Sequence, residues 1–592
     1  MPRNFHRKCY YFHMEHTELY KIRHSLAHIL AIAVKEKYPH AKMAIGPVIE
    51  NGFYYDFDFS GGGSPTDKDL KELQKRMKKL ASQNLDFTKE EIDETGAREL
   101  FKNEPYKIEL INEIARSDRK ITLYKTGNFT DLCEGPHVVN TKEISPDAFA
   151  LTSIAGAYWH GDEKKPMLTR IYGVAFESKE ALAEYKAMRD EAAKRDHRKI
   201  GKELGLFTFS DLVGSGLPMF TPKGTTIRDA IAEKIRLLQE PYGYERVWIP
   251  HIAKRELYET SGHWEKFQND LFHVKGKADA EFVMKPMNCP HHTQIYAATM
   301  RSYRDLPVRF MEFTTNYRDE QPGELLGLSR VRSLTQDDGH VFCTIEQVKG
   351  EAKNIVAVIR QFYSSLGMFK NDSFRVLLSV RDQSAPDKYI GKPEHWETAE
   401  QMLREIAEEE NLPFKRAEGE AAFYGPKLDF MFKDALGREW QLATIQIDFN
   451  MPERFGLTYI DKDGLKKTPV MIHRAIAGSL ERFLAVIIEH FAGAFPVWLA
   501  PIQTIVLPIG EAHHEYAEHV YGVLKKAGVR AALDSSGETL GKKIRSANMQ
   551  KIPYTLVIGD KEKESSTATI ESRDSGTIGE KPIEEFIALI QS

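Results

Sequence analysis

In the first third of the chain, hydrophobic residues recur at helical spacing in one segment and alternate with polar residues in the next. An apolar face at helical spacing predicts a helix that carries two histidines, whereas the alternating residues of 44–58, between turn formers, predict a hairpin. A charged helix at about 67–83 and a mixed segment complete an expected α+β domain at 17–177, after an irregular N-terminal tail at 1–16. The helical face comprises His24, Ala27, His28, Ala31 and Val34.

The rest of the chain divides into three segments. Residues 178–205 are dense in Lys, Glu, Arg and Ala, which is typical of a solvated linker helix. Residues 206–497 alternate helices with short strands and form a larger domain, and 498–592 repeat strand and helix, which predicts a small α/β domain with a mixed sheet. We therefore expect an α+β multidomain protein.

Polar side chains crowd one face of two strands predicted within 309–342. Strand side chains alternate between two faces, so an antiparallel pair would bring three arginines, two carboxylates and a histidine to one surface. A solvated face is the alternative for any one of them, but the combination favours a ligand site. The residues are Arg318, Glu320, Arg330, Arg332, Asp338 and His340, with Gln336 on the same face.

This set suits a nucleoside triphosphate. Guanidinium groups bind phosphate oxygens bidentately, and a carboxylate can accept from an adenine amino group. The chain has no P-loop motif, so arginine side chains would hold the phosphates. Val470–His473 predicts a strand that enters a helix; a packed helix with a solvent-reaching arginine is the alternative to a ligand face there. That face would comprise Ala475, Gly478, Ser479 and Arg482.

One thiol and two imidazoles form a candidate metal site. Cys289, His340 and His473 are a three-ligand set of the kind that binds zinc and leaves a fourth position open for substrate or water. A structural zinc would need a fourth protein ligand. Cys343 is a candidate, but it lies three residues beyond His340 on one strand and should point to the opposite face.

A second cluster combines His-x-x-x-His with Cys-x-x-x-His. His24 and His28 share a helix face, and Cys133 and His137 stand in a later segment. From these residues alone, a metal site and separate core histidines both stay open.

Composition narrows the class of protein. The 592 residues are 42% hydrophobic and 28% charged, with a net charge of −4, so a nucleic-acid partner would need local basic patches. We find no apolar run that could span a bilayer and no secretory signal. Four cysteines fit a reducing compartment, so we expect a cytoplasmic protein that does not associate with membranes.

Five segments together closely resemble threonyl-tRNA synthetases, a family of class II aminoacyl-tRNA synthetases. The resemblance runs from about residue 20 to the end. It implies a class II core with an antiparallel sheet and flanking helices, an N-terminal α+β editing domain and a C-terminal α/β anticodon-binding domain. It also implies a homodimer, with Tyr244–Pro250 at the interface. The segments are Lys285–Pro290, Tyr317–Glu320, Arg330–His340, Tyr424–Lys427 and His473–Phe483.

The resemblance further implies a threonine–tRNA ligase that uses ATP with Mg²⁺ and one Zn²⁺ per subunit to charge tRNA(Thr). By it, Arg318 contacts the α-phosphate, Glu320 and Arg482 the adenine, and Arg330 the outer phosphates. Zinc is implied at Cys289, His340 and His473. The remaining residues implied at the active site are Gln336, Asp338, Tyr424, Lys427, Gln441, Gln446 and Ser479.

Threonine and valine are nearly isosteric, and an apolar pocket separates a hydroxyl from a methyl by only roughly 10². Zinc could bind both the amino group and the hydroxyl of threonine, with Asp338 accepting from that hydroxyl. Serine carries the same hydroxyl, so a hydrolytic second site is needed. By the resemblance this editing site comprises His24, His28, Lys107, Asp131, Cys133 and His137.

The chain departs from the family at a few places. We expect it to lack the small N-terminal domain that many members carry, because His24 comes early. Glu571 stands where an anticodon-contacting arginine is common, with Arg573 nearby, whereas Glu562 matches a contact position. A regulatory RNA-binding protein and a freestanding editing hydrolase are the competing hypotheses; the intact ATP-site residues and the large central domain speak against them.

Overall fold

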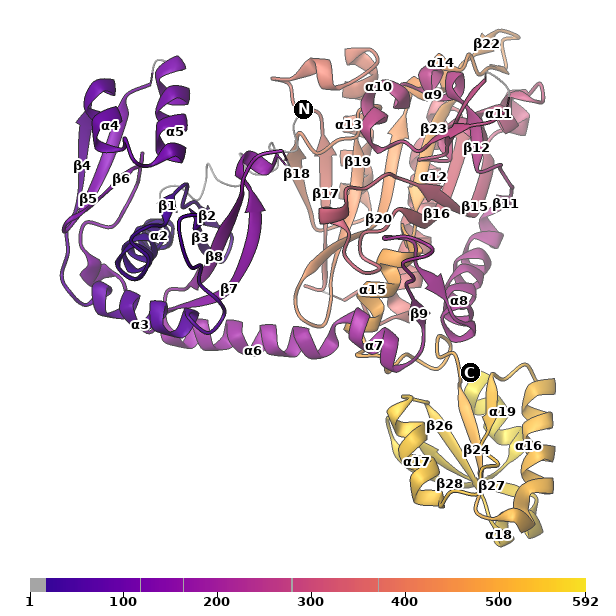
Figure 1. The fold of residues 1–592 in the computed structure, drawn as a ribbon. Coiled ribbons are helices and arrows are strands. Elements are labelled where there is room, and N and C mark those ends of the chain that lie inside the picture. Colours follow the sequence, from indigo (N-terminus) through magenta and orange to yellow (C-terminus); the bar gives the residue numbers. More distant parts are fainter. Residues whose placement is uncertain (1–16, 118, 163, 278–279, 371, 592) are drawn as a thin grey trace. The chain divides into compact units, whose positions relative to one another are not determined.

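The computed structural model describes residues 17–117, 119–162, 164–277, 280–370 and 372–591, so the predicted tail at 1–16 lies outside it. The chain forms two compact units that divide between Asp190 and Glu191 (Figure 1). We describe each unit by itself.

The first unit packs one long helix on a curved antiparallel sheet. Thr17 caps α2 by accepting from the amide of Tyr20 over 3.1 Å, and the middle of the helix is buried. The sheet has the order β1-β3-β8-β7, and β2 forms the predicted hairpin with β3. The elements are α2 (Glu18–Lys37), β1 (Lys42–Met43), β2 (Val48–Ile49), β3 (Gly52–Asp58), α3 (Leu70–Ala81), β7 (Phe149–Tyr158) and β8 (Met167–Ala175).

A second, three-stranded sheet completes this unit, in the order β4-β5-β6. Its strands and two helices are β4 (Phe87–Ile92), α4 (Glu94–Leu100), α5 (Pro105–Arg116), β5 (Ile121–Thr126) and β6 (Phe129–Leu132). The strand β6 ends next to Cys133, which brings this residue toward α2.

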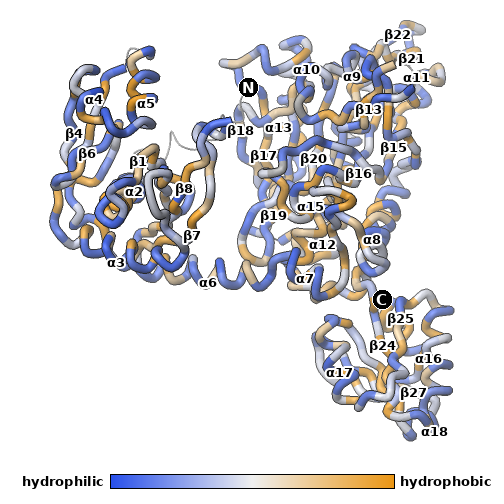
Figure 2. The backbone as a smooth tube through the Cα atoms, in the orientation of Figure 1, coloured by the Kyte–Doolittle hydropathy of each residue, from blue (hydrophilic) through white to orange (hydrophobic). Residues whose placement is uncertain are grey.

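The linker segment contains two helices, not the single helix expected. The first, α6 (Lys179–Arg195), is largely hydrophilic and buries Leu182 (Figure 2). The second, α7 (His197–Glu203), begins after Asp196, whose side chain accepts from the amide of Arg198 over 2.8 Å. This cap interrupts the helix, and periodicity of charge could not show that.

The second unit is built on an eight-stranded sheet with the order β11-β15-β16-β23-β20-β19-β17-β18 (Figure 1). Its interior pairs are antiparallel, as expected, whereas the edge strands β11 and β18 join in parallel. The strands are β11 (Glu245–Arg246), β15 (Val308–Tyr317), β16 (Ser333–Cys343), β17 (Phe374–Val380), β18 (Phe414–Glu418), β19 (Lys427–Lys433), β20 (Glu439–Asp448) and β23 (Val470–Ala475).

Helices cover one face of this sheet and form its main core. Val341 and Cys343 of β16 point into this core, whereas Asp338 and His340 point to the opposite face. The covering helices are α8 (Pro222–Gln239), α12 (Val348–Ser365), α13 (Pro393–Glu409) and α15 (Leu480–His490). The two-residue period of the strand thus separates packing residues from residues that a ligand can reach.

Smaller elements surround the sheet. They are β9 (Phe207–Thr208), β10 (Met219–Phe220), β12 (Ile252–Lys254), α9 (Arg255–Ser261), α10 (His263–Phe267), β13 (His273–Lys275), β14 (Glu281–Met284), α11 (Cys289–Ala297), α14 (Asn450–Arg454), β21 (Tyr459–Ile460) and β22 (Lys466–Lys467). Of these, β12, β14 and β13 form a separate antiparallel sheet.

The C-terminal part of the second unit has a five-stranded mixed sheet, as expected, in the order β25-β24-β26-β27-β28. Its elements are β24 (Thr504–Pro508), α16 (His514–Lys526), β25 (Ala531–Leu533), α17 (Leu540–Met549), β26 (Tyr554–Ile558), α18 (Asp560–Ser565), β27 (Thr567–Ser572), β28 (Gly576–Pro582) and α19 (Ile583–Gln591). The sequence pattern did not indicate α18 or β28. Among the described residues, no helix combines the length and the apolar character that crossing a bilayer requires.

Candidate active site

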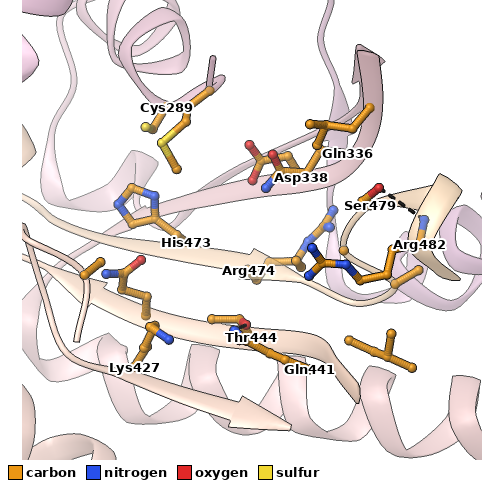
Figure 3. Close-up of a pocket in the computed structure, with 18 of the residues that line it drawn as sticks. Cys289, Gln336, Asp338, Lys427, Gln441, Thr444, His473, Arg474, Ser479 and Arg482 are labelled. Carbon is orange, nitrogen blue, oxygen red and sulfur yellow. Dashed lines mark hydrogen bonds between the residues drawn. The ribbon is translucent and has the colours of Figure 1, made fainter. Parts of the chain in front are cut away.

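One cavity of about 330 Å³ on the open face of the eight-stranded sheet collects the residues predicted for the central site, except Arg332. Figure 3 shows Cys289 and His473 at one end of this cavity and Arg482 at the other, with Asp338 and Gln336 between them. The predicted residues that line it are Cys289, Arg318, Glu320, Arg330, Gln336, Asp338, His340, Tyr424, Lys427, Gln441, Gln446, His473, Ser479 and Arg482.

Strand pairing brings the two imidazoles together. His340 on β16 stands directly opposite His473 on β23, with His340 Nε2 3.0 Å from His473 Nδ1. Cys289 opens α11, and one donor atom from each of the three residues lies within 4.8 Å of the others. Burial lowers the pKa of His340 and raises the pKa of the Cys289 thiol. The trio therefore offers three donor atoms that converge on one point.

Side chains behind the trio fix the orientation of both rings. The Asp448 carboxylate accepts from His473 Nε2 over 2.9 Å, and Nδ1, on the other side of the ring, faces His340 Nε2. On the other side, His292 Nδ1 lies 2.7 Å from His340 Nδ1, and Glu312 lies 3.7 Å from His292 Nε2. Such carboxylate–histidine pairs typically support metal-binding histidines.

The support that Asp448 and His292 give to the two rings was not predicted from the sequence. Asp448 follows Gln446 on the same strand face, and His292 lies one helical turn after Cys289, so both signals were present in the spacing. Cys343 is buried in the helix-covered core, as its spacing from His340 predicted, and it does not join the donor group found in the described residues.

A buried polar network orients Asp338. Asn288 Nδ2 donates to Asp338 Oδ2 over 2.9 Å, and Lys285 Nζ donates to Asn288 Oδ1 and to Thr314 Oγ1. Burial raises the pKa of Asp338 and lowers the pKa of Lys285 to about 8. One carboxylate oxygen of Asp338 is thus occupied, and the other is available on the cavity side.

Asp429, which sequence reasoning missed, organises the floor of the cavity. Its carboxylate accepts from Lys427, from Gln441 Nε2 over 2.7 Å and from Thr444 Oγ1 over 3.0 Å. Figure 3 shows Lys427, Gln441 and Thr444 converging from neighbouring strands. Asp429 lies two residues after Lys427 on β19, so the strand period could have identified it.

The arginine end differs in detail from the expectation. The strands β15 and β16 are antiparallel, as predicted, but Arg318, Glu320 and Arg330 lie in the loop between them and not on strands. They still line the cavity, whereas Arg332 turns away and donates to the Glu320 carbonyl. The prediction that all three arginines share one strand face was therefore wrong.

The turn into α15 also corrects an expectation. Ala475 ends β23, Gly478 has a φ of +64°, and Ser479 caps the helix by accepting from the amide of Arg482. The small residues do not share a helical face, since the helix begins only at Leu480. They nevertheless line the cavity together with Arg482, because the turn itself forms part of its wall.

The arginines at this end of the cavity differ in whether their hydrogen-bond donors already have partners within the protein. Arg330 donates to Glu320 and Glu324, at distances of 2.6 Å and 2.8 Å, and Arg482 Nε donates to the Ser329 carbonyl. The buried Nε of Arg318 has no hydrogen-bond partner among the described residues. Burial lowers the pKa of Arg318, but a guanidinium stays charged at neutral pH. This end of the cavity therefore favours a polyanionic ligand.

The second cluster assembles within the first unit. Cys133 Sγ lies 3.4 Å from His24 Nε2 and 3.2 Å from His137 Nε2, and His28 belongs to the same donor group. His24 Nδ1 donates to the Pro136 carbonyl, so its Nε2 is the bare nitrogen. Burial lowers the pKa of His24 to about 4 and that of His28 to about 3, and it raises the pKa of Cys133 to about 12. The cluster is neutral at physiological pH.

A buried ion pair adjoins this cluster. Lys107 Nζ lies 2.5 Å from Asp131 Oδ1, and the Tyr55 hydroxyl donates to Asp131 Oδ2 over 2.6 Å. Although burial opposes it, Lys107 holds the pKa of Asp131 below its usual value. The six residues predicted for the second site therefore lie together, and Tyr55 joins them without any signal in its sequence spacing.

Three family descriptions match the chain. "tRNA synthetase class II core domain (G, H, P, S and T)" matches residues 272–491, and "Anticodon binding domain" matches 503–592. "Threonyl and Alanyl tRNA synthetase second additional domain" matches 121–172, within the first unit.

Two relatives that align over nearly the whole chain show which family it belongs to. A threonine–tRNA ligase of Gloeobacter violaceus is 50% identical over 586 residues, which cover 97% of this chain and 92% of the relative. One from Thermosynechococcus vestitus is 49% identical over 588 residues, which cover 98% and 96%. The chain belongs to the threonine–tRNA ligase family.

Solved structures agree with this assignment to the threonine–tRNA ligase family. A crystal structure titled as the RNA binding domain of threonyl-tRNA synthetase from Cryptosporidium parvum aligns with a TM-score of 0.63 and 37% identity, covering 67% of this chain and 98% of that chain. A putative threonyl-tRNA synthetase from Aeropyrum pernix aligns with a TM-score of 0.60 and 32% identity, covering 67% and 95%. The expected fold class, a class II core with an additional N-terminal domain and an anticodon-binding domain, is confirmed.

In the part that matches the anticodon-binding domain, several charged side chains that were considered near the RNA form hydrogen bonds within the protein. Arg573 donates to the carbonyls of Lys551 and Phe495, and Lys543 is buried with its ammonium on the carbonyls of Pro508 and Asp534. Glu562 accepts from the Gly559 amide and the Thr569 hydroxyl. The Lys543 ammonium is therefore used for hydrogen bonds within the fold.

Proposed function

We propose that this chain is a threonine–tRNA ligase that activates L-threonine with ATP, transfers it to tRNA(Thr) and hydrolyses mischarged Ser-tRNA(Thr). The observation that carries this proposal is the single cavity that joins a thiol–imidazole end to an arginine end, in a member of this family. An amino acid and a nucleotide fit head to tail between two such ends.

In the first step, a carboxylate oxygen of threonine attacks the α-phosphorus of ATP, and the bond to pyrophosphate breaks. Arg318, whose Nε lacks a protein partner, is placed to stabilise charge on the α-phosphate. Arg330 would bind the outer phosphates, and Arg482 would cover the adenine with Glu320 at its amino group. Magnesium accompanies ATP as part of the substrate.

In the second step, the terminal ribose hydroxyl of the tRNA attacks the carbonyl carbon of the adenylate, and AMP leaves. Lys427, Gln441 and Thr444, held together by Asp429, would position the adenylate at the cavity floor. Tyr424, Gln446, Gln336 and Ser479 line the rest of the cavity beside it.

The thiol–imidazole end fits zinc, and we propose that Cys289, His340 and His473 hold one zinc ion per subunit. Their donor types match a three-ligand zinc site, and Asp448 and His292 hold the rings for it. When bound, zinc would supply a Lewis-acid centre that could bind both the amino group and the hydroxyl of threonine.

Asp338 would complete the recognition of threonine. Asn288 occupies one of its oxygens, so the other is left to accept a hydroxyl hydrogen from the substrate. Valine has no hydroxyl and would leave Asp338 unpaired in a buried site, which costs about 1–3 kcal/mol. Serine satisfies the same groups, which explains why a second, hydrolytic site is needed.

The first unit would supply that hydrolytic site. We assign 17–177 to editing, 206–497 to catalysis and 498–592 to anticodon binding, with the linker at 178–205. His24, His28, Cys133 and His137 would position water and the seryl ester, and Lys107 and Asp131 form a buried ion pair beside them. The free thiols of the described cysteines suit a reducing cytoplasm, where we place the enzyme.

Threonine-dependent exchange of pyrophosphate into ATP tests the ligase activity. We expect exchange with threonine and none with valine. Arg318→Ala should lower the exchange rate by roughly 10²–10³, the usual loss when one transition-state donor is removed. Arg375→Ala is the matched control, because Arg375 forms a surface pair with Glu439 outside the cavity. Folded, zinc-loaded protein that gives no exchange would contradict the ligase assignment.

Zinc retention tests the support of the metal site. His292→Phe removes the partner of His340, so zinc affinity should fall roughly 10–100-fold. His291→Phe is the control, because His291 is buried on the same helix without a hydrogen-bond partner among the described residues. Zinc content per chain and release to a chelator are the measurements. Equal retention in both variants would overturn the role of His292.

Clearance of Ser-tRNA(Thr) tests the editing site. His24→Ala combined with His28→Ala should leave threonylation unchanged and let Ser-tRNA(Thr) accumulate, since the hydrolytic cluster lies in a separate unit. His40→Ala serves as a control, because His40 bonds to the Gly63 carbonyl outside the cluster. If the double variant deacylates Ser-tRNA(Thr) at the normal rate, the site is misassigned.

We also propose a homodimer. Trp248, at the segment that resembles the class II interface, is 76% exposed next to the edge strand β11. Trp248→Asp should shift the protein toward monomer in sedimentation velocity, whereas Leu465→Asp, at another exposed apolar site, should not. A monomeric wild-type protein at micromolar concentration would refute the proposal.

A further inference from the structure

A buried histidine of α7 holds the tip of the loop between β15 and β16. The Leu328 amide donates to His197 Nε2 over 3.0 Å, and His197 is 3% exposed. This loop carries Arg330, two residues beyond Leu328, and the Leu328 side chain is anchored in the main core. The contact thus joins the linker segment to a loop that lines the cavity.

Hydrogen bonding fixes the tautomer of His197. Because an amide N–H points at Nε2, that nitrogen must accept, and Nδ1 carries the hydrogen that is donated to Glu489 Oε1 over 2.6 Å. Both ring nitrogens are therefore used. The neighbouring carboxylates of Asp196 and Glu489 do not make this a metal site, since no nitrogen of His197 is left to bind one.

At its tip the loop lies so close to the His197 ring that only glycine fits there. A Cβ built on Gly327 would lie 2.3 Å from His197 Nε2, and Gly327 has a φ of +49°. Gly323, at the other side of the same loop, would meet nothing within 4 Å. The close packing is confined to the tip that His197 holds.

On its other side, the histidine is fixed to α15. Glu489 also accepts from the His197 backbone amide and from Arg438, and Arg195 donates to the His490 carbonyl. Burial raises the pKa of Glu489, but the bonds from His197 and Arg438 outweigh this and lower it, so the carboxylate stays charged. Glu489 lies two helical turns after Arg482 on the same helix.

The loop and α15 are therefore tied at two points. Arg482 donates to the Ser329 carbonyl, and Glu489 is joined through His197 to the Leu328 amide. Under the proposed function the first tie involves a residue that also covers the adenine, so ligand binding acts on it directly. The tie through His197 involves no residue that contacts a ligand, so it can persist.

We propose that His197 is a positioning residue for ATP: it holds the Gly327–Arg330 turn against α15, so that Arg330 stays at the outer phosphates when Arg482 engages the nucleotide. This inference rests on the proposed ligase function. It predicts an effect on ATP that is distinct from effects on threonine.

Two substitutions of His197 test its two side-chain hydrogen bonds independently. Asn retains a donor at the Nδ1 position for Glu489 but has no atom at the Nε2 position, whereas Gln can place an acceptor near Nε2. We expect His197→Asn to raise the KM for ATP in pyrophosphate exchange by about tenfold, with the KM for threonine within about twofold of the wild-type value, because a lost buried hydrogen bond corresponds to that change. His197→Gln should restore much of the affinity for ATP.

Hydrogen exchange provides a readout that does not depend on activity. In His197→Asn, the amides of the segment 321–332 should exchange faster, while those of β16 and α15 keep their protection, and the unfolding temperature should match that of His197→Gln. Wild-type ATP affinity or unchanged exchange in the loop would overturn the inference. A uniform loss of stability and of both affinities would show a merely structural role. Wild-type protein without any threonine-dependent exchange would instead refute the proposed function.

Discussion

The buried ion pair between Asp337 and Arg474 is the constraint on which the catalytic face depends. Arg474 Nη1 donates to Asp337 Oδ1 over 2.5 Å, and Asp337 Oδ2 accepts from the amides of Ile476 and Ala477. Both side chains are fully buried. Removing one partner of such a pair typically costs about 3–5 kcal/mol, because the other charge is left in a low-dielectric interior.

This pair determines where the functional residues lie. Asp337 stands between Gln336 and Asp338 on β16, and Arg474 follows His473 on β23, so the pair locks the register that places His340 opposite His473. Its bonds to the Ile476 and Ala477 amides end the strand and begin the turn to Arg482. A Cβ at position 339 would lie 2.5 Å from Arg474 Nε, which explains the glycine there. The thiol–imidazole end and the arginine end of the cavity are therefore positioned by one interaction behind the sheet.

The sequence predicted the parts of this site that follow a strand period. Gln336, Asp338 and His340 share a face because successive strand residues alternate, and Cys343 is excluded from the site for the same reason. The orientation of Arg332 and the turn at Gly478 were not predicted, because the conformation of a loop depends on contacts with distant segments. For Arg332 one such contact is with Ser215. His197 acts through a partner 131 residues away, and no local pattern records such a contact. Asp429 shares a strand face with Lys427, but its contact with Gln441 on the next strand is likewise absent from any local pattern.

The ion pairs of Arg330 at the arginine end of the cavity have a consequence for the binding of a nucleotide. Arg330 is neutralised by Glu320 and Glu324, so a phosphate that takes its guanidinium must displace carboxylates, and the freed carboxylates must find new partners. The adenine amino group is a suitable new partner for Glu320, since it donates hydrogen bonds where Arg330 did. Under the proposed function, binding of the base and binding of the phosphates would thereby be coupled, because either one alone would leave a charged group of the loop without its partner. Under the proposed function, a nucleoside triphosphate would satisfy both ends at once, whereas pyrophosphate or a nucleoside alone would satisfy one, so the loop would select the whole nucleotide.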